Sequence, residues 1–367
     1  MKILAANWRD PLHPEAGGAE VHLDKILSYL ALNHEVVLVT TRTSGIPEEY
    51  QYHGYQILRL GHPFLFHYTF KKLWQQRFQH ESFDIVIDDI SKIGISSPQF
   101  IHNVPIVAIF HHLHGHTLYQ LLPFPLAYYV AWAEKNALKS YRYTPIVTVS
   151  PSSKDELMKI LPFNKVIVLP NGIDDNFFVN NDKTPGLFCS VGRLTKAKRI
   201  DLSIKLFSLV NRQFPYTELV IAGKGKEESH LKQLVKKLNL ENKVKFLGFI
   251  SEAEKIELLS KAEGFLFTTE KEGWGITALE ASAARTPVFG FSVAGIKDSV
   301  INNKNGFLAP FGDIENLYKY IEIYLSFDVA KKKEIQQSVQ LFAKQFDWTS
   351  ITKQFETILL KTISEFH

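Results

Sequence analysis

The sequence alternates short apolar runs with glycine-bearing loops and amphipathic helices, and this alternation limits the possible folds more than any other feature. The apolar run at 2–6 is followed by a loop that contains Gly17 and Gly18. A helix with apolar residues at i, i+3, i+4 and i+7 then begins at Glu20, and a second apolar run occupies 36–40. This strand–helix–strand unit predicts an α/β fold built on parallel sheets.

The same alternation starts again in the second half of the chain. The two halves are separated by a segment rich in Asn, Asp, Gly and Pro that shows no periodicity. A chain of 367 residues is long enough for two α/β domains. We therefore predict a first domain over 1–172, a linker over 173–186, a second domain over 187–345 and a final helix over 346–367.

Composition narrows the possible environments of the protein. Hydrophobic residues make up 45% and charged residues 22%, as in ordinary globular proteins. A single cysteine, Cys189, excludes an internal disulfide and fits a reducing cytosol. The residues at 1–6 are too few and too soon polar for a signal peptide, and no later run is long enough to span a membrane. We expect a cytoplasmic protein, free or peripheral on the cytoplasmic face of the membrane.

The net charge of +4 is mild. It suits an anionic small substrate or an anionic membrane surface, and by itself it does not distinguish between the two. We expect no nucleic-acid partner.

One strand–turn–helix stretch in the second half carries the clearest chemical signal. An apolar run at 264–268 leads to Gly273 and Gly275, where a helix begins. The first N–H groups of such a helix point outward and favour an anion. Glu272 in the loop and Glu280 in the helix could then hold hydroxyl groups of the molecule that carries the anion. The structural alternative is a helix cap followed by an exposed glutamate.

A basic loop follows the first predicted strand of the second domain. This strand, 187–191, leads into Gly-Arg-Leu-Thr-Lys-Ala-Lys-Arg, which includes Arg193 and Lys198. Guanidinium and ammonium groups at the start of the next helix could clamp a phosphate. The alternative is a solvated basic turn.

Histidines and acidic residues follow two strands of the first domain. His112, His114 and His116 could share one face of an extended segment and bind a metal, although Gly115 argues against a regular strand. The pair at 88–89, both aspartates, has no third ligand nearby, so we interpret these residues as turn residues at a strand end.

The segment 63–78 is rich in aromatic and basic residues. Its apolar side chains fall near one stripe of a helix. This pattern is typical of a helix that packs on the core with a solvated basic back. The alternative is an interfacial helix that docks on an anionic membrane surface.

Taken together, these motifs resemble the retaining, nucleotide-sugar-dependent glycosyltransferases of the GT-B group, family 4. Seven residues separate Glu272 from Glu280 within Glu-Gly-Trp-Gly-Ile-Thr-Ala-Leu-Glu, as in the E-x7-E signature of that family. The loop with Arg193 and Lys198 resembles its Gly-Arg-…-Lys motif, and the usual glycine after the lysine is Arg199 here, so we expect a tighter or shifted loop. Val-Thr-Val-Ser-Pro-Ser-Ser and Leu-Pro-Asn-Gly-Ile-Asp also resemble the family's domain junction.

The resemblance implies two Rossmann-like domains that face each other across a cleft, with a C-terminal helix that crosses back to the first domain. The first domain would bind the acceptor and the second the donor. The resemblance also implies site residues. The expected catalytic residues are His111, Glu272, Arg193 and Lys198. The expected donor-binding residues are Gly17, Gly18, Arg193, Lys198, Gly223, Lys224, Phe249, Glu272, Gly273, Trp274, Gly275, Ile276 and Glu280.

The implied reaction is a hexosyltransferase-like transfer from a UDP- or GDP-sugar to a glycan or lipid-linked acceptor, with retention of the anomeric configuration, in cell-surface glycan biosynthesis. No metal ion and no cofactor is expected. Two alternatives stay open. The chain could be a GT-B epimerase or phosphorylase, or it could be a non-catalytic subunit that binds a nucleotide sugar.

Overall fold

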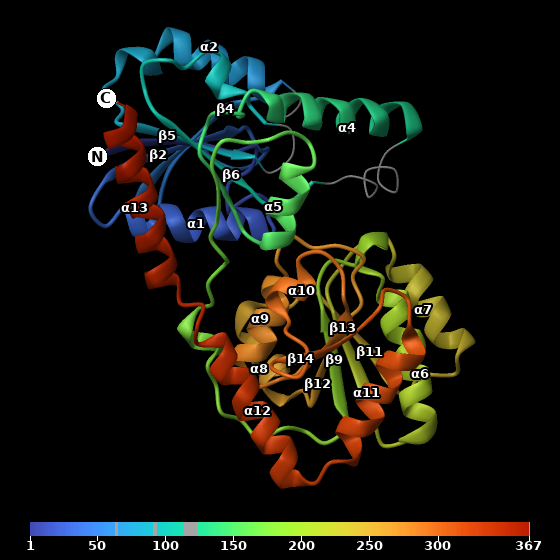
Figure 1. Ribbon diagram of the computed structural model, residues 1–367. Coiled ribbons are helices and arrows are strands. Elements are labelled where there is room, and N and C mark those ends of the chain that lie inside the picture. Colours follow the sequence, from blue (N-terminus) through green and yellow to red (C-terminus); the bar gives the residue numbers. More distant parts are fainter. Residues whose placement is uncertain (63–64, 91–93, 114–122, 367) are drawn as a thin grey trace. The chain divides into compact units, whose positions relative to one another are not determined.

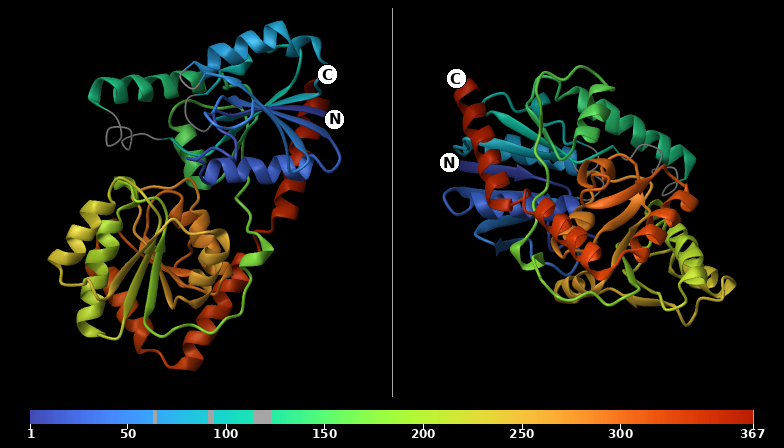
Figure 2. Two further views of the ribbon diagram at one scale, coloured as in Figure 1. Left: turned by 180° about the vertical axis from the view of Figure 1, so that it is seen from behind. Right: turned by 60° about the horizontal axis from the view of Figure 1, so that its bottom comes forward.

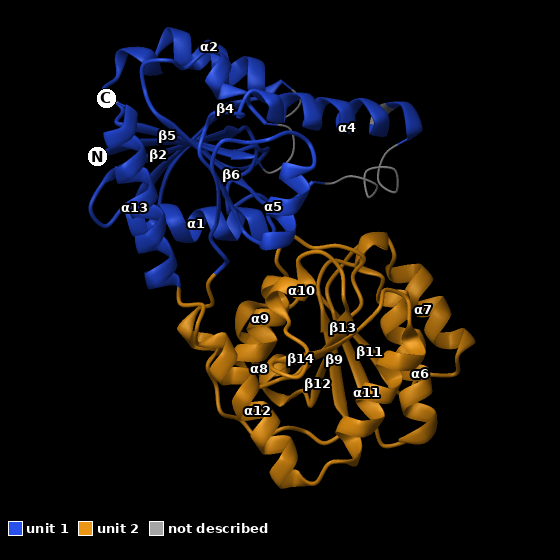
Figure 3. Cartoon of the chain, in the orientation of Figure 1, with its two compact units in different colours: residues 1–171, 348–367 blue, residues 172–347 orange. Residues whose placement is uncertain are grey.

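The computed structural model describes residues 1–62, 65–90, 94–113 and 123–366 (Figures 1 and 2). The chain divides into two compact units (Figure 3). The first comprises Met1–Asn171 and Trp348–His367, and the second Gly172–Asp347. Each unit is a parallel-sheet α/β domain, which confirms the predicted fold class.

The first unit is built on a mostly parallel sheet. In the described part of this unit the sheet has eight strands in the order β3-β4-β2-β1-β5-β6-β7-β8, and only β3 and β4 pair antiparallel. The strands are β1 (Lys2–Ala6), β2 (Glu35–Thr41), β3 (Glu49–Tyr52), β4 (Tyr55–Gly61), β5 (Ile85–Ile90), β6 (Ile106–Phe110), β7 (Ile146–Thr148) and β8 (Val166–Val168). The described helices are α1 (Gly18–Leu30), α2 (Phe66–Gln76), α4 (Phe124–Lys139), α5 (Pro151–Met158) and α13 (Trp348–Phe366), with short 3-10 turns at Phe78–His80 and Ser97–Gln99.

Alternate residues of β1 serve two separate cores, as the period of a strand requires. Ile3 and Ala5 pack under α1 and α13, whereas Leu4 and Ala6 pack on the opposite face, under α2. Both faces of the sheet are therefore covered, which explains why its strands are apolar throughout.

The second unit has a fully parallel sheet in the order β11-β10-β9-β12-β13-β14. Its strands are β9 (Leu187–Val191), β10 (Glu218–Ala222), β11 (Val244–Gly248), β12 (Gly264–Phe267), β13 (Val288–Phe291) and β14 (Gly306–Ala309). Its helices are α6 (Ile200–Gln213), α7 (Glu228–Lys237), α8 (Glu252–Lys261), α9 (Ile276–Ala283), α10 (Ile296–Ser299), α11 (Ile314–Ser326) and α12 (Val329–Ala343), with 3-10 turns at Asp175–Phe177 and Lys196–Lys198. Helices α6, α7 and α11 cover one face of the sheet, and α8, α9, α10 and α12 cover the other.

The C-terminal helix α13 belongs to the first unit, although it follows the second unit in sequence. Its residues Ile351, Phe355 and Leu359 are buried in the core that lies under α1. Figure 1 shows α13 (red) beside α1 (blue), and their contacts agree with that view. The apolar face of this helix therefore completes the first domain.

The segment 173–186 is not a free linker, which corrects the sequence interpretation. Ile173 and Phe177 are buried in the core of the second unit. The N–H of Ile173 donates to the carbonyl of Phe346 at 2.8 Å, so the segment is also tied to the end of that unit. The segment is rich in residues typical of turns, so the sequence shows no periodic pattern that predicts the burial of Ile173 and Phe177.

The first two residues of the segment 63–78 lie outside the residues that the structure describes. The rest of the segment contains helix α2. The stripe formed by Phe66, Phe70 and Trp74 is almost fully buried against the sheet. These side chains are not available to a membrane, so the interfacial interpretation of this stripe is wrong. The core-packing alternative is correct.

Replacing Phe70 with alanine should destabilise the protein by about 3–5 kcal/mol, because it removes a fully buried ring. Tyr68→Ala on the same helix removes a ring that is 66% exposed and should cost no more than about 0.5 kcal/mol. Urea unfolding of both variants measures the difference. Equal losses would contradict the assignment of the buried stripe.

Candidate functional site

The loops that carry the predicted motifs meet at the carboxyl edge of the second sheet. Strand β9 has β10 on one side and β12 on the other. From β9 the strands continue toward one edge of the sheet as β10 and β11, and toward the other edge as β12, β13 and β14, so the strand order reverses between β9 and β12. Ligands of open α/β sheets bind outside the carboxyl ends of the strands at such a switch point. The loop after β9 carries Arg193 and Lys198, and the loop after β12 carries Glu272.

The two loops are joined by a backbone hydrogen bond, a side-chain hydrogen bond and an ion pair. The N–H of Glu270 donates to the carbonyl of Ala197 at 2.9 Å, and the hydroxyl of Thr268 donates to the carbonyl of Arg199 at 2.7 Å. The ammonium group of Lys198 donates to Glu272 Oε1, with both side chains largely buried. A cation and an anion that are 74 residues apart in sequence thus form one ion pair at the sheet edge.

Arg193 differs from Lys198 in its surroundings. Its side chain is exposed and makes no hydrogen bond or ion pair with any residue in the described ranges. A guanidinium group in this position can reach a bound anion without first breaking a contact.

Arg199 adopts the left-handed conformation, with φ of 48°. Glycine takes this conformation without strain. This explains why the motif that the loop resembles has a glycine at the position of Arg199. The Arg199 guanidinium is fixed on Asp201 by two hydrogen bonds of 3.0 and 3.1 Å. The loop therefore has, at Arg199, the backbone conformation suited to glycine.

The turn after β10 lies directly against the loop after β9. A Cβ on Gly223 would lie 1.9 Å from the carbonyl oxygen of Gly192, so only glycine permits this approach. Lys224 accepts the N–H of Leu194 on its carbonyl, and its side chain is exposed. Phe249, in the next turn, is 78% exposed and free to stack on a planar ring.

Helix α9 begins at Ile276, and Gly275 precedes it in the left-handed region with φ of 90°. The first N–H groups of α9 have no partner within the helix and carry partial positive charge. Gly273 and Trp274 are buried, and the Trp274 ring packs edge-on against Phe346 at 5.5 Å. The indole of Trp274 therefore supports the loop, and its buried Nε1 has no hydrogen-bond partner among the described residues.

Glu280 lies inside α9 and is nearly buried. Its Oε1 accepts a hydrogen bond of 2.7 Å from the ammonium group of Lys255 on α8. Burial raises the pKa of Glu280, and the charge of Lys255 opposes that rise. Each acid of the E-x7-E motif is thus held by its own lysine. Lys255 was missed at the sequence level.

In the first unit, the glycine loop after β1 ends at the N-terminus of α1. Gly17 is the N-cap residue, and its N–H donates to Glu20 Oε2 at 2.7 Å. Gly18 is the first residue of the helix. The loop is anchored by Asp10, whose carboxylate receives two hydrogen bonds of 2.8 and 2.9 Å from the fully buried Arg59 guanidinium. These hydrogen bonds fix the backbone of Gly17 and Gly18 at the N-terminus of α1.

His111 follows β6 directly and is part of a buried polar chain. Its Nε2 lies 2.8 Å from Asp89 Oδ1, and Asn7 Nδ2 donates to Asp89 Oδ2 at 3.1 Å. Burial opposes charging of the imidazole, but the Asp89 carboxylate outweighs it and raises the pKa of His111. This arrangement fixes the His111 ring and favours its protonated form.

The aspartates are therefore not turn residues, which corrects the sequence interpretation. Asp88 and Asp89 lie within β5 and are buried. Asp88 accepts hydrogen bonds from the hydroxyls of Ser97 and Tyr141. The sequence signal for this contact was the alternation of side chains along β5 and β6. It places Asp89 and His111 on the same face of the sheet, the face that α1 covers.

The alternative metal site depends on residues that are only partly described. His112 lies in the described part, whereas His114 and His116 lie outside it. Within the described ranges no three His, Cys, Asp or Glu side chains are grouped as metal ligands.

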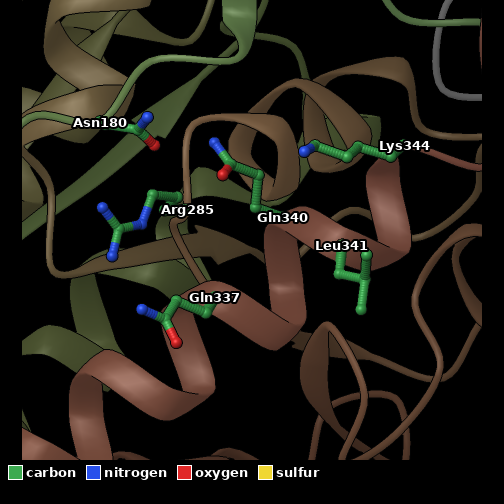
Figure 4. Close-up of a pocket in the computed structure, with 6 residues that line it drawn as sticks. All are labelled: Asn180, Arg285, Gln337, Gln340, Leu341 and Lys344. Atoms are coloured by element: carbon green, nitrogen blue, oxygen red, sulfur yellow. The ribbon is translucent and has the colours of Figure 1, made fainter.

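A separate pocket of about 550 Å³ lies in the second unit, away from these loops (Figure 4). It is lined by Asn180, Arg285, Gln337, Gln340, Leu341 and Lys344. Arg285 joins α9 to β13 at the amino edge of the sheet, opposite the edge that carries Arg193 and Glu272. None of the residues expected at the site lines this pocket.

No helix within the described ranges combines the length and the apolar character that a membrane crossing requires.

Comparisons with known proteins agree with this geometry. The family of glycosyl transferases group 1 matches residues 173–341, and Glycosyltransferase Family 4 matches residues 16–177. Glycogen synthase from Mycobacterium tuberculosis is 27% identical over 212 residues, which are 56% of this chain and 51% of that protein. The chain therefore matches about half the length of that relative.

Two solved structures share the fold. Sucrose-phosphate synthase from Thermosynechococcus elongatus has a TM-score of 0.84 at 18% identity and covers 99% of both chains. Anabaena HepE in complex with UDP-glucose has a TM-score of 0.75 at 19% identity and covers 100% of both chains. These likenesses confirm the GT-B fold.

Substitution of Gly295 tests how the Glu272 loop is held. A Cβ on Gly295 would lie 2.2 Å from the carbonyl oxygen of Glu272, and φ at this glycine is +81°. Gly312 has a similar φ of +84° with no atom within 4 Å, so Gly312→Ala reports the backbone strain alone. We expect Gly295→Ala to lose about 1–3 kcal/mol more stability than Gly312→Ala in urea unfolding. Equal losses of stability in the two variants would show that the Glu272 loop moves aside at no cost, and would contradict the close packing of Gly295 against it.

Proposed function

Because the chain belongs to the group 1 glycosyltransferases, we propose that it transfers a sugar from a nucleoside diphosphate sugar to a glycan or lipid-linked acceptor, with retention and without a metal ion. The observation that carries the proposal is the pairing of the Lys198 loop with the Glu272 loop at the sheet edge. The complex of Anabaena HepE with UDP-glucose supports a UDP-sugar as the first donor to test, with GDP-sugars as the second.

The Lys198–Glu272 ion pair suits a donor that carries both a diphosphate and sugar hydroxyls. In the structure the two charges neutralise each other. A bound donor offers each of them a new partner, the diphosphate for Lys198 and a sugar hydroxyl for Glu272. Arg193 and the first N–H groups of α9 add donors for the diphosphate.

In the proposed reaction the bond between the anomeric carbon and the diphosphate oxygen breaks, and its electron pair leaves with the diphosphate. The acceptor hydroxyl oxygen bonds to the anomeric carbon, and its proton passes to the departing diphosphate. Negative charge grows on that leaving group, so fixed cations stabilise the transition state more than the ground state. Arg193 and Lys198 would supply this stabilisation, and no covalent intermediate on Glu272 is assigned.

His111 would orient the transferred sugar by a hydrogen bond. Its support comes from Asp89 and Asn7, which hold the ring in one orientation. Glu280 would accept hydrogen bonds from the ribose hydroxyls. Asp89 holds the ring through Nε2, so His111 would act as a positioned hydrogen-bond donor.

Arg193→Ala and Glu272→Ala should each lower the rate of sugar transfer by about 10²–10³-fold, because Arg193 would stabilise the departing diphosphate and Glu272 would position the sugar. Lys319→Ala and Glu315→Ala on α11 remove exposed charges elsewhere in the same unit and should leave the rate unchanged. Rates are measured with UDP- and GDP-sugars in the presence of EDTA. Wild-type rates in the Arg193 and Glu272 variants, or a requirement for an added divalent ion, would contradict the proposal.

The acceptor side has a surface that fits a membrane-bound substrate. Helix α4 presents an exposed stripe, Tyr128, Trp132, Lys135 and Lys139, at helical spacing. Aromatic rings followed by basic groups are typical of a helix that rests on an anionic lipid surface. The acidic residue of α4, Glu134, is buried and so does not repel anionic lipid. We assign the peripheral membrane contact to this stripe.

Flotation with vesicles tests the membrane contact. The wild-type protein should float with vesicles that contain phosphatidylglycerol and stay behind with vesicles of phosphatidylcholine alone. The double variant Tyr128→Ala/Trp132→Ala should lose flotation, whereas Lys71→Ala/Lys72→Ala on α2 should keep it. Flotation that survives the α4 changes, or its absence in the wild type, would overturn this assignment.

A further inference from the structure

Lys255 occupies an unusual position for a lysine on a surface helix. Its ammonium group lies 2.7 Å from Glu280 Oε1, and the two side chains are only 20% and 10% exposed. It also lies 4.9 Å from the centroid of the Phe177 ring, which is itself buried. Glu252, one turn earlier on α8, lies 3.8 Å away. Lys255 is therefore enclosed between a carboxylate and an aromatic face.

Glu280 needs such a partner to stay ionised. Burial raises its pKa, and the charges of Glu252 and Asp174 act in the same direction. Among the charges of the described residues that shift it, only Lys255 acts the other way. Without Lys255 the carboxyl would gain a proton more readily and would lose part of its capacity to accept hydrogen bonds.

The ion pair uses only one of the two carboxylate oxygens. Glu280 Oε1 receives the ammonium group, and Oε2 accepts no hydrogen bond from a residue in the described ranges. Oε2 is also not among the buried polar atoms that lack a partner, so it reaches solvent. One carboxylate oxygen is anchored by the ammonium group, and the other is held in one orientation and reaches solvent.

We propose that Lys255 is a positioning residue for the donor: it holds Glu280 ionised and in one orientation, so that Oε2 can accept hydrogen bonds from the two ribose hydroxyls of a nucleoside diphosphate. This inference rests on the proposed function, because it takes Glu280 as the ribose-binding acid. Lys255 acts through Glu280 and does not touch the reacting atoms.

A purely structural role predicts a different behaviour. An ion pair that only fastens α8 to α9 would, when broken, weaken the binding of every nucleotide to a similar degree. A positioning role weakens only the binding of nucleotides that carry the ribose hydroxyls. The 2′,3′-dideoxy form of the same nucleotide separates the two cases.

The experiment compares nucleotide affinities by isothermal titration calorimetry. The probe is the tightest binder among UDP, GDP and ADP, together with its 2′,3′-dideoxy counterpart. Lys255→Met keeps the apolar stem over Phe177 and removes the charge. It should weaken the normal nucleotide about tenfold or more, because a hydrogen bond to a charged group is lost, and it should leave the dideoxy form unchanged.

Two further variants complete the test. Lys261→Gln breaks a second lysine–glutamate pair on the same helix, the 2.6 Å contact to Glu257, and should change neither affinity. Lys255→Arg keeps the positive charge and should retain most of the affinity for the normal nucleotide. In Lys255→Met the affinity should also begin to fall at a higher pH as the solution is acidified, because Glu280 then gains a proton sooner.

Each outcome has a distinct meaning. Equal weakening of both nucleotides in Lys255→Met, or no weakening of either, would overturn the positioning role and leave the proposed function standing. Failure of the wild-type protein to bind any of the three nucleotides would overturn the proposed function itself. If Lys255→Met does not fold, Lys255→Gln, which also removes the charge, decides the case in the same way: a loss confined to the normal nucleotide supports the inference, and an equal loss of both or no loss contradicts it.

Discussion

The parallel pairing of β9 with β12 is the constraint on which the candidate donor site depends. Parallel strands end at the same edge of a sheet, so loops that are far apart in sequence are brought together there. The Lys198–Glu272 ion pair and the hydrogen bonds from Glu270 and Thr268 are consequences of this register. Glycines then let the neighbouring backbones approach closely, as at Gly223 against Gly192.

Much of the fold could be predicted because its signals are local. The apolar runs that become β1, β9 and β12 are continuous in sequence, since both faces of each sheet are covered. Gly275 before α9 likewise marks a helix start without knowledge of the rest of the chain. The residues expected at the donor site, such as Arg193 and Glu272, follow strands directly, and the fold carries them to one edge.

The interactions that were missed all depend on which elements pack together. Asp89 meets His111 because β5 and β6 pair in a particular register, and sequence alone does not give that register. Lys255 meets Glu280 because α8 packs beside α9. The stripe of α2 could have faced either the core or solvent, and only the position of the sheet decides. Helix α12, at Val329–Ala343, was not assigned from the sequence.

Two buried carboxylates, one in each unit, share one physical feature: each is held by an opposite charge. Asp10 is held by Arg59, and Glu280 by Lys255. Burying an ionised group costs free energy unless it is paired and hydrogen-bonded. In the first unit the pair fixes the glycine loop at the start of α1. In the second unit the pair leaves one carboxylate oxygen ready for a ligand.

The most direct test of this account is a crystal structure of the protein with a bound nucleoside diphosphate sugar. The account predicts the diphosphate at the carboxyl edge of β9 and β12, with its oxygens within hydrogen-bond distance of Arg193 and Lys198 and with Glu272 on the sugar. A nucleotide bound away from that edge, or a diphosphate held through a metal ion, would contradict it.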